Sequence, residues 1–176
     1  MSDSSLVVPN PVTFEQAIAI TQSLLAAMES GISAAQIQST IADLVHSENG
    51  ARGFFVTYLT DERLLADEPS TAVVQALQSA PETVAELLVK NLAMSTAMAI
   101  AHRRNHNEEM AQGSDRVQRR TTQLIHQVKL SEVSLKAQKL LHSVVTGAGE
   151  YQTFLDRWGY DDEQRQRIGE ALQPLV

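Results

Sequence analysis

Apolar residues recur three and four positions apart along almost the whole chain, and this helical period is the strongest constraint on its fold. Two such segments open with a capping box, in which Thr13 is followed by Gln16 and Ser33 by Gln36. In a capping box the two side chains satisfy backbone N–H groups that the start of a helix leaves unpaired. The pattern therefore predicts helices from 13 to about 30 and from 33 to about 46.

The segment 51–65 has the composition of a strand, because Phe54, Phe55, Val56, Tyr58 and Leu59 are aromatic, β-branched or aliphatic. Its apolar positions nevertheless follow the spacing of one helix face. No other segment offers a partner strand, and an isolated strand leaves its backbone groups unpaired. A helix that is central to the core is therefore the prediction.

Two long helical patterns dominate the second half of the chain. Pro81 suits the first turn of a helix, where its missing N–H costs nothing. Gly113 and Ser114, in the sequence QGSD at 112–115, suggest a tight break. A short helix after Pro69 and two more, near 150–157 and 162–172, complete the pattern.

Together these segments predict an all-α fold. We expect a helical bundle of about six to seven helices, built around a long antiparallel hairpin with arms at about 81–111 and 115–145. Residues 1–12 are expected to form a flexible N-terminal segment, and residues 13–176 a single helical domain.

Composition excludes several classes of protein. The chain has 176 residues, 43% of them hydrophobic and 20% charged, which is ordinary for a globular protein. It contains no cysteine, which excludes disulfides, thiolate metal ligands and catalytic thiols. The start lacks the pattern of a secretory signal, and the longest apolar run, at 92–101, is half the length of a membrane span. We expect a soluble, cytoplasmic protein without a membrane partner.

Charge is distributed unevenly along the chain. Residues 1–89 hold only Arg52 and Arg63 against eleven acidic residues, a net charge of −9. Residues 90–140 hold nine basic and four acidic residues, a net charge of +5, and residues 141–176 hold three and six, a net charge of −3. The basic segment is expected to meet either an acidic partner or the acidic parts of this chain itself.

Five arginines gather where the hairpin is expected to turn: Arg103, Arg104, Arg116, Arg119 and Arg120. A guanidinium group binds carboxylates and phosphates with two parallel hydrogen bonds. These residues are therefore candidate binding residues for an anion or an acidic partner. The alternative is charge pairing across the hairpin, with Glu108 and Glu109 near Arg116, Arg119 and Arg120. The chain's net charge of −7 and the acidic residues among the arginines argue against nucleic acid.

Histidines near the same turn suggest a second kind of site. His102, His106 and Glu109 can share one helix face, and a break near 113–114 would place His126 opposite His102. Three imidazoles and one carboxylate would suit a divalent metal such as zinc. The neighbouring arginines would repel a cation. We therefore expect the protein to bind no cofactor, and a divalent metal at these histidines is the alternative.

The sequence contains no nucleophile elbow, no phosphate-binding loop and no HExxH motif, so no catalytic motif is recognised in it. We therefore expect a non-enzymatic protein-interaction or assembly protein that uses its long hairpin and basic tip. The partner would be another protein or a second copy in a homodimer. The alternative function is a helical-bundle protein that binds a metal or small ligand, with or without catalysis, through the histidines.

Overall fold

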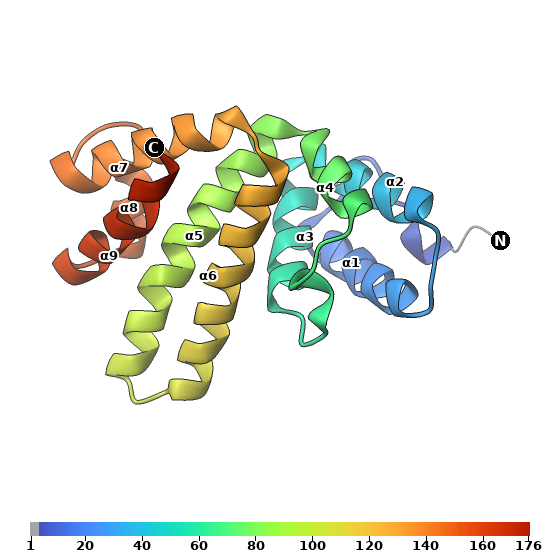
Figure 1. Cartoon of the computed structure of the whole chain (residues 1–176), viewed down its shortest axis with the longest axis horizontal. Coiled ribbons are helices and arrows are strands. Elements are labelled where there is room, and N and C mark those ends of the chain that lie inside the picture. Colours follow the sequence, from blue (N-terminus) through green and yellow to red (C-terminus); the bar gives the residue numbers. More distant parts are fainter. Residues whose placement is uncertain (1–3) are drawn as a thin grey trace. The chain divides into compact units, whose positions relative to one another are not determined.

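The computed structural model of the chain describes residues 4–176 and is all-α (Figure 1). It is 79% helical, with nine α-helices and no strand among the residues that it describes. The predicted helical bundle is confirmed, although it has more helices than the six to seven expected. Two compact units share the chain: a first unit of Met1–Leu87 with His126–Val128, and a second unit of Leu88–Ile125 with Lys129–Val176.

The first unit is built from four helices and two short 3-10 turns. Its elements are η1 (Ser4–Leu6), α1 (Phe14–Glu29), α2 (Ala34–Val45), α3 (Glu48–Thr60), η2 (Leu64–Ala66) and α4 (Thr71–Gln78). The capping boxes predicted at Thr13 and Ser33 are both present. α3 packs on α1 and α2, and α4 packs on α2.

Helix α3 confirms the prediction made for the ambiguous segment. Its aromatic residues Phe54, Phe55 and Tyr58 are buried at no more than 1% exposure, and the rings of Phe54 and Tyr58 stack 5.0 Å apart. Gly53 lets α3 approach α1 closely, because a Cβ atom there would lie 2.4 Å from the Cβ atom of Ala17. Burial of one helix face thus outweighs the strand-like composition.

The second unit contains most of the residues of the remaining helices. They are α5 (Pro81–Arg104), α6 (Glu108–Val128), α7 (Ser131–Thr146), α8 (Gln152–Trp158), α9 (Asp162–Leu172) and the 3-10 turn η3 (Gln173–Leu175). The boundaries of the two units fall inside α5 and α6. Figure 1 shows α5 and α6 side by side and antiparallel, and α7 packs against both α8 and α9.

The predicted arms of the hairpin, 81–111 and 115–145, are wrong. The chain turns at 105–107, where His106 has a φ of 57° and the Asn107 side chain accepts a hydrogen bond from the backbone N–H of Met110. Gly113 and Ser114 lie inside α6 instead of breaking it. The second arm is interrupted at Lys129, which ends α6 with a φ of 49°, so α7 is a separate helix.

The flexible N-terminal segment expected at residues 1–12 stays a prediction. Residues 1–3 lie outside the described part of the chain, but Leu6 and Val12 are buried in the first unit. The single domain expected at 13–176 also stays a prediction. The division into two compact units does not decide it, because compactness does not by itself show that a unit folds independently.

Helix α5 is the one described helix that is long and apolar enough to cross a membrane, judged by length and composition alone. In the fold, 56% of its apolar stretch is buried. A core helix of a soluble protein passes the same test, so the helix does not decide localisation. The cytoplasmic location stays a prediction.

Candidate functional site

A groove of about 750 Å³ lies in the second unit, between α5, α6 and α9. Helix α5 supplies the more buried part of the lining, which we call the floor, and two exposed residues beside it. Its lining residues there are spaced three and four apart and so share one helix face: Thr96, Ala99, Ile100, Arg103 and Arg104. The first three are buried or half-buried and mostly apolar, whereas the two arginines are exposed. We call this feature the hairpin groove.

The walls of the hairpin groove come from α6 and α9. Their lining residues are mostly charged or polar: Asp115, Gln118, Glu163, Arg167, Glu170 and Ala171. With the α5 residues, the lining contains three arginines and three carboxylates. The groove therefore has a small, apolar floor and a rim whose formal charges cancel.

Arg103 joins the two helices of the hairpin. Its guanidinium group donates hydrogen bonds to Asp115 at 2.6 Å and to Glu108 at 3.2 Å, both on α6. These bonds raise the pKa of Arg103, with Asp115 making the larger contribution. Charge pairing across the hairpin is therefore found at Arg103, which is not one of the arginines for which the sequence predicts it.

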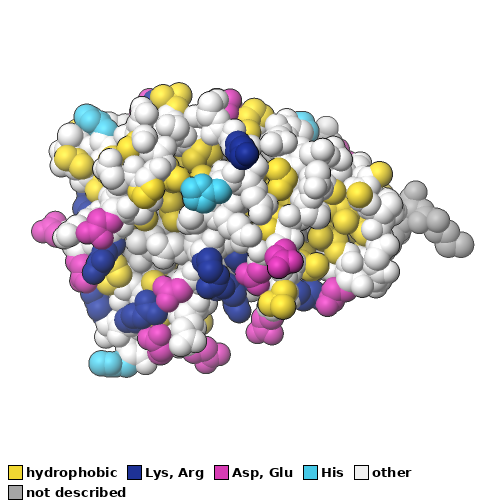
Figure 2. Space-filling model, in the orientation of Figure 1, with side chains coloured by type: hydrophobic (Ala, Val, Ile, Leu, Met, Phe, Trp, Pro, Cys, Tyr) yellow, Lys and Arg dark blue, Asp and Glu magenta, His cyan; other side chains and the backbone are white. Residues whose placement is uncertain are grey.

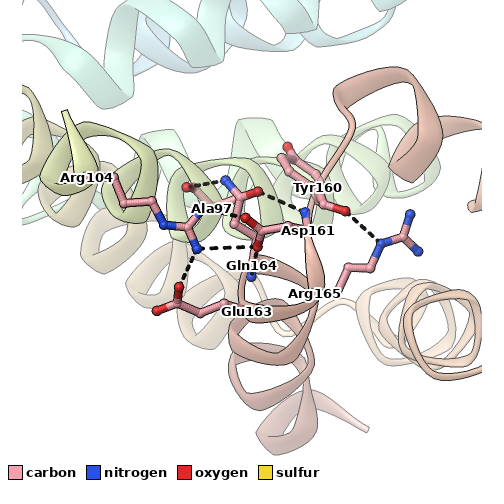
Figure 3. Close-up of polar contacts among 7 residues, drawn as sticks. All are labelled: Ala97, Arg104, Tyr160, Asp161, Glu163, Gln164 and Arg165. Carbon is pink, nitrogen blue, oxygen red and sulfur yellow. Dashed lines mark hydrogen bonds and ion pairs between the residues drawn. The ribbon is translucent and has the colours of Figure 1, made fainter.

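Arg104 joins α5 to the start of α9 (Figure 3). Its guanidinium group donates hydrogen bonds to the carboxylates of Asp161 and Glu163. Asp161 is the N-cap of α9, and its side chain accepts a hydrogen bond from the backbone N–H of Gln164 at 2.9 Å. The Arg104 guanidinium, followed by this N–H, lowers the pKa of Asp161.

Gln164 provides a second connection between α9 and α5. Its Oε1 accepts from the backbone N–H of Asp161, and its Nε2 donates to the carbonyl oxygen of Ala97 at 3.1 Å. Beside it, burial raises the pKa of the Tyr160 phenol to about 12. The wall formed by α9 is thus positioned by a capping box that also bonds to the floor helix.

Figure 2 shows basic and acidic side chains interleaved over the lower ends of α5 and α6. The hairpin tip therefore does not present a continuous basic surface on that face. Arg103 and Arg104 are 44% and 43% exposed and are held by four carboxylates. To bind these two guanidinium groups, an acidic partner would have to displace the four carboxylates.

The other three predicted arginines do not line the groove. Arg119 is exposed, whereas Arg120 is only 1% exposed. Arg116 is half-buried, and its Nε is a buried atom without a hydrogen-bond partner. The predicted cluster of five thus separates into two residues at the rim and three elsewhere on α6.

The predicted metal ligands occupy different environments. His102 is half-buried, with an Nε2 atom that is buried and lacks a hydrogen-bond partner, whereas His106, Glu109 and His126 are exposed. The turn at 105–107 places the first two turns of α6 beside His102. His126 is at least ten residues further along that helix, or about 15 Å. The expectation that His126 faces His102 is therefore wrong.

Across residues 4–176, no group of three or more His, Asp or Glu side chains is arranged to hold a metal ion. The zinc site stays a prediction without a ligand cluster in this part of the chain.

Sequence reasoning missed the contribution of α9 to the site. Glu163, Arg167 and Glu170 form a charged face at helical spacing, but such a face is normally solvated. Only the tertiary contact of α9 with α5 turns that face into one wall of a groove.

Residues 13–175 match the model of a family described as uncharacterised conserved protein UCP020893. The chain belongs to this family. The match spans both compact units. No curated protein and no solved structure matches the chain.

Proposed function

We propose that this member of the family is a non-enzymatic protein-interaction protein that binds an α-helix of another protein in the hairpin groove. The observation that supports this is the lining of the groove. A helix laid along the groove would place an apolar stripe on Thr96, Ala99 and Ile100 and its polar flanks against α6 and α9. This is the arrangement by which helix-binding proteins recognise amphipathic helices.

A small molecule is the competing occupant, because the volume of the groove lies in the usual range for ligand pockets. Such pockets bury most of their ligand's surface. Here the charged side chains of the rim are 41–59% exposed: Arg103, Arg104, Asp115, Glu163, Arg167 and Glu170. An open rim of this kind favours an extended partner that continues beyond the groove.

Photo-crosslinking would test the proposed function. A benzophenone amino acid is placed at Gln118 on α6 or at Ala171 on α9, and the full chain is irradiated in a lysate of its native host. We expect the same protein to be crosslinked from both groove positions, through a helical segment. It should not be crosslinked from Gln138, an exposed position on α7 outside the groove.

A matched pair of variants makes the test specific to the groove. Ile100→Lys places a charge on the floor and should abolish the crosslink, whereas Val56→Lys changes an exposed valine of α3 and should leave it intact. Equal crosslinking from Gln138, or crosslinking that survives Ile100→Lys in a folded chain, would contradict the proposal.

Self-association is a separate proposal for the partner. If a second copy occupies the groove, light scattering at micromolar concentration gives a dimer mass, and Ile100→Lys returns the chain to a monomer. A monomer mass for the wild-type chain would remove this form of the proposal.

A further inference from the structure

The exposed charges along the α9 wall form a regular order. Glu163, Arg167 and Glu170 are spaced four and three residues apart, so they lie along one face of the helix. All three line the hairpin groove, and their side chains are 58%, 59% and 54% exposed. The wall therefore presents acidic, basic and acidic groups in succession to whatever occupies the groove.

We propose that the occupant is a helix of a different protein, with basic, acidic and basic residues along the flank that faces α9. This inference rests on the proposed function and specifies the partner. In paired helices, flanking charges of this kind set partner choice and orientation, because like charges placed opposite each other are unfavourable. A helix parallel to α9 would carry its charges at i, i+4 and i+7, and an antiparallel one at i, i+3 and i+7.

The ion pairs at the rim can be replaced by ion pairs to a partner helix at little cost. Glu163 is paired with Arg104, and Arg167 with Glu170 at 3.3 Å, but all four side chains are at least 43% exposed. Ion pairs between exposed side chains contribute little to stability because water screens them. Replacing them with pairs to the partner helix therefore loses little and adds specificity.

The apolar part of the partner is specified by the floor. Ala99 and Thr96 are small, Ile100 is the largest apolar side chain of the floor, and Ala171 is small as well. Small side chains at these positions allow two helix backbones to approach closely. The partner's central stripe should therefore consist of alanine and medium-sized aliphatic residues, with no large aromatic ring.

A second copy of the chain does not supply the required helix. Among the α-helices of residues 4–176, none carries a basic, an acidic and a basic residue at these spacings. The charge order thus favours a different protein over self-association.

Designed peptides that stand in for the partner helix would test the inference. Two 21-residue amphipathic helices share an alanine–leucine stripe and differ only in the flank, which reads Lys–Glu–Lys in the matched peptide and Glu–Lys–Glu in the reversed one. Each is made with both spacings, and charges on the solvent face equalise the net charge. Binding to the full chain is followed by fluorescence anisotropy of the labelled peptide.

We expect one matched peptide to bind at least tenfold more tightly than its reversed counterpart. Arg167→Glu should remove this preference, and a peptide with a Lys–Lys–Lys flank should restore binding to that variant. Arg157→Glu is the control, because it makes the same change of charge at an exposed position of α8 outside the groove. Circular dichroism checks that each variant keeps its helical content.

Equal or tighter binding of the reversed peptides would overturn the inference, as would failure of the Lys–Lys–Lys peptide to restore binding. If no peptide binds but Gln118 and Ala171 still crosslink a protein, the charge order is wrong and the proposed function stands. If neither experiment gives binding, both proposals are wrong.

Discussion

Lys129 ends α6 in a backbone conformation that side chains other than glycine rarely adopt, with a φ of 49°. In this left-handed region the Cβ atom approaches the following carbonyl oxygen, at a cost of about 1 kcal/mol or more. The residue is exposed, so its side chain adds little packing that would offset this cost. The position is one where glycine should be better than the natural residue.

We expect Lys129→Gly to raise the free energy of unfolding by about 0.5–1 kcal/mol, because glycine has no Cβ atom. The control is Lys129→Ala, which removes the charge and keeps the Cβ atom. Urea denaturation followed by circular dichroism measures both variants. A gain in Lys129→Ala as large as in Lys129→Gly would show that the charge, rather than the backbone conformation, is responsible.

Asp161 makes the attachment of α9 dependent on pH. Its pKa in the folded chain lies below the ordinary value of 3.8, chiefly because Arg104 donates to its carboxylate. A carboxyl group with a lowered folded pKa stabilises the fold well above pH 3.8, and this contribution is lost as the pH falls through the folded pKa.

Asp161→Asn should therefore be less stable than the wild-type chain near pH 7, and the difference should narrow as the pH drops below about 4. Unfolding free energies measured from pH 7 to pH 2 would check this. Asp162→Asn removes the same charge one residue later and leaves the Arg104 contact in place. A difference between wild type and Asp161→Asn that stays constant with pH would contradict the expectation.

Two glycines inside helices have opposite surroundings. Gly53 on α3 lies against α1, where a Cβ atom would be 2.4 Å from the Cβ atom of Ala17 and 2.9 Å from the carbonyl oxygen of Phe14. Gly113 on α6 has nothing within 4 Å of such an atom. The same substitution should therefore have opposite signs in the two helices.

Gly113→Ala should stabilise the chain by up to about 1 kcal/mol, the difference in helix propensity between the two residues. Gly53→Ala should destabilise it by about 1–3 kcal/mol, because α1 and α3 must separate. Thermal and urea unfolding of the two variants measure both changes. A loss of stability in Gly113→Ala would mean that Gly113 has a role that the helix does not reveal.

The helices themselves were predictable wherever the local signals agreed. The capping boxes at Thr13 and Ser33 and the start at Pro81 depend on neighbouring residues, and all three are correctly predicted. The turn of the hairpin is wrongly predicted, because the sequence QGSD around Gly113 has the composition of a typical helix break. The actual turn, at 105–107, contains no glycine. The one local signal for it is Asn107, which caps the start of α6.

For the whole molecule, the uneven charge of the sequence follows the two compact units. The first unit holds two basic and eleven acidic residues, a net charge of −9, and the second holds twelve and ten, a net charge of +2. Both basic residues of the first unit are engaged. Arg52 lies over the ring of Phe14, and Arg63 pairs with Glu29 and Asp61.

The groove could not be predicted at this scale. The sequence indicated Arg103 and Arg104, but the opposite wall, from Glu163 to Ala171, is about 60 residues away along the chain. Helical periodicity shows which residues share a face and does not show which faces meet.

Charge at the scale of the molecule also predicts what the chain does not bind. Its net charge is −7, and the two rim arginines are held by carboxylates, so phosphate backbones find little uncompensated positive charge there. We expect no shift of duplex DNA or RNA in a gel at about 20 mM salt, where such binding is strongest. A shift that weakens steeply with added salt would contradict this and would make the arginines of α6 the first to substitute.

The acidic character of the first unit has a practical consequence for chemistry on its surface. No lysine occurs before Lys90, so the side chains of the first unit carry no primary amine. Acetylation, ubiquitin attachment to lysine and amine-reactive fluorophores are therefore directed to the four lysines of the second unit, apart from any free α-amino group. A dye coupled in this way reports on the unit that contains the hairpin groove.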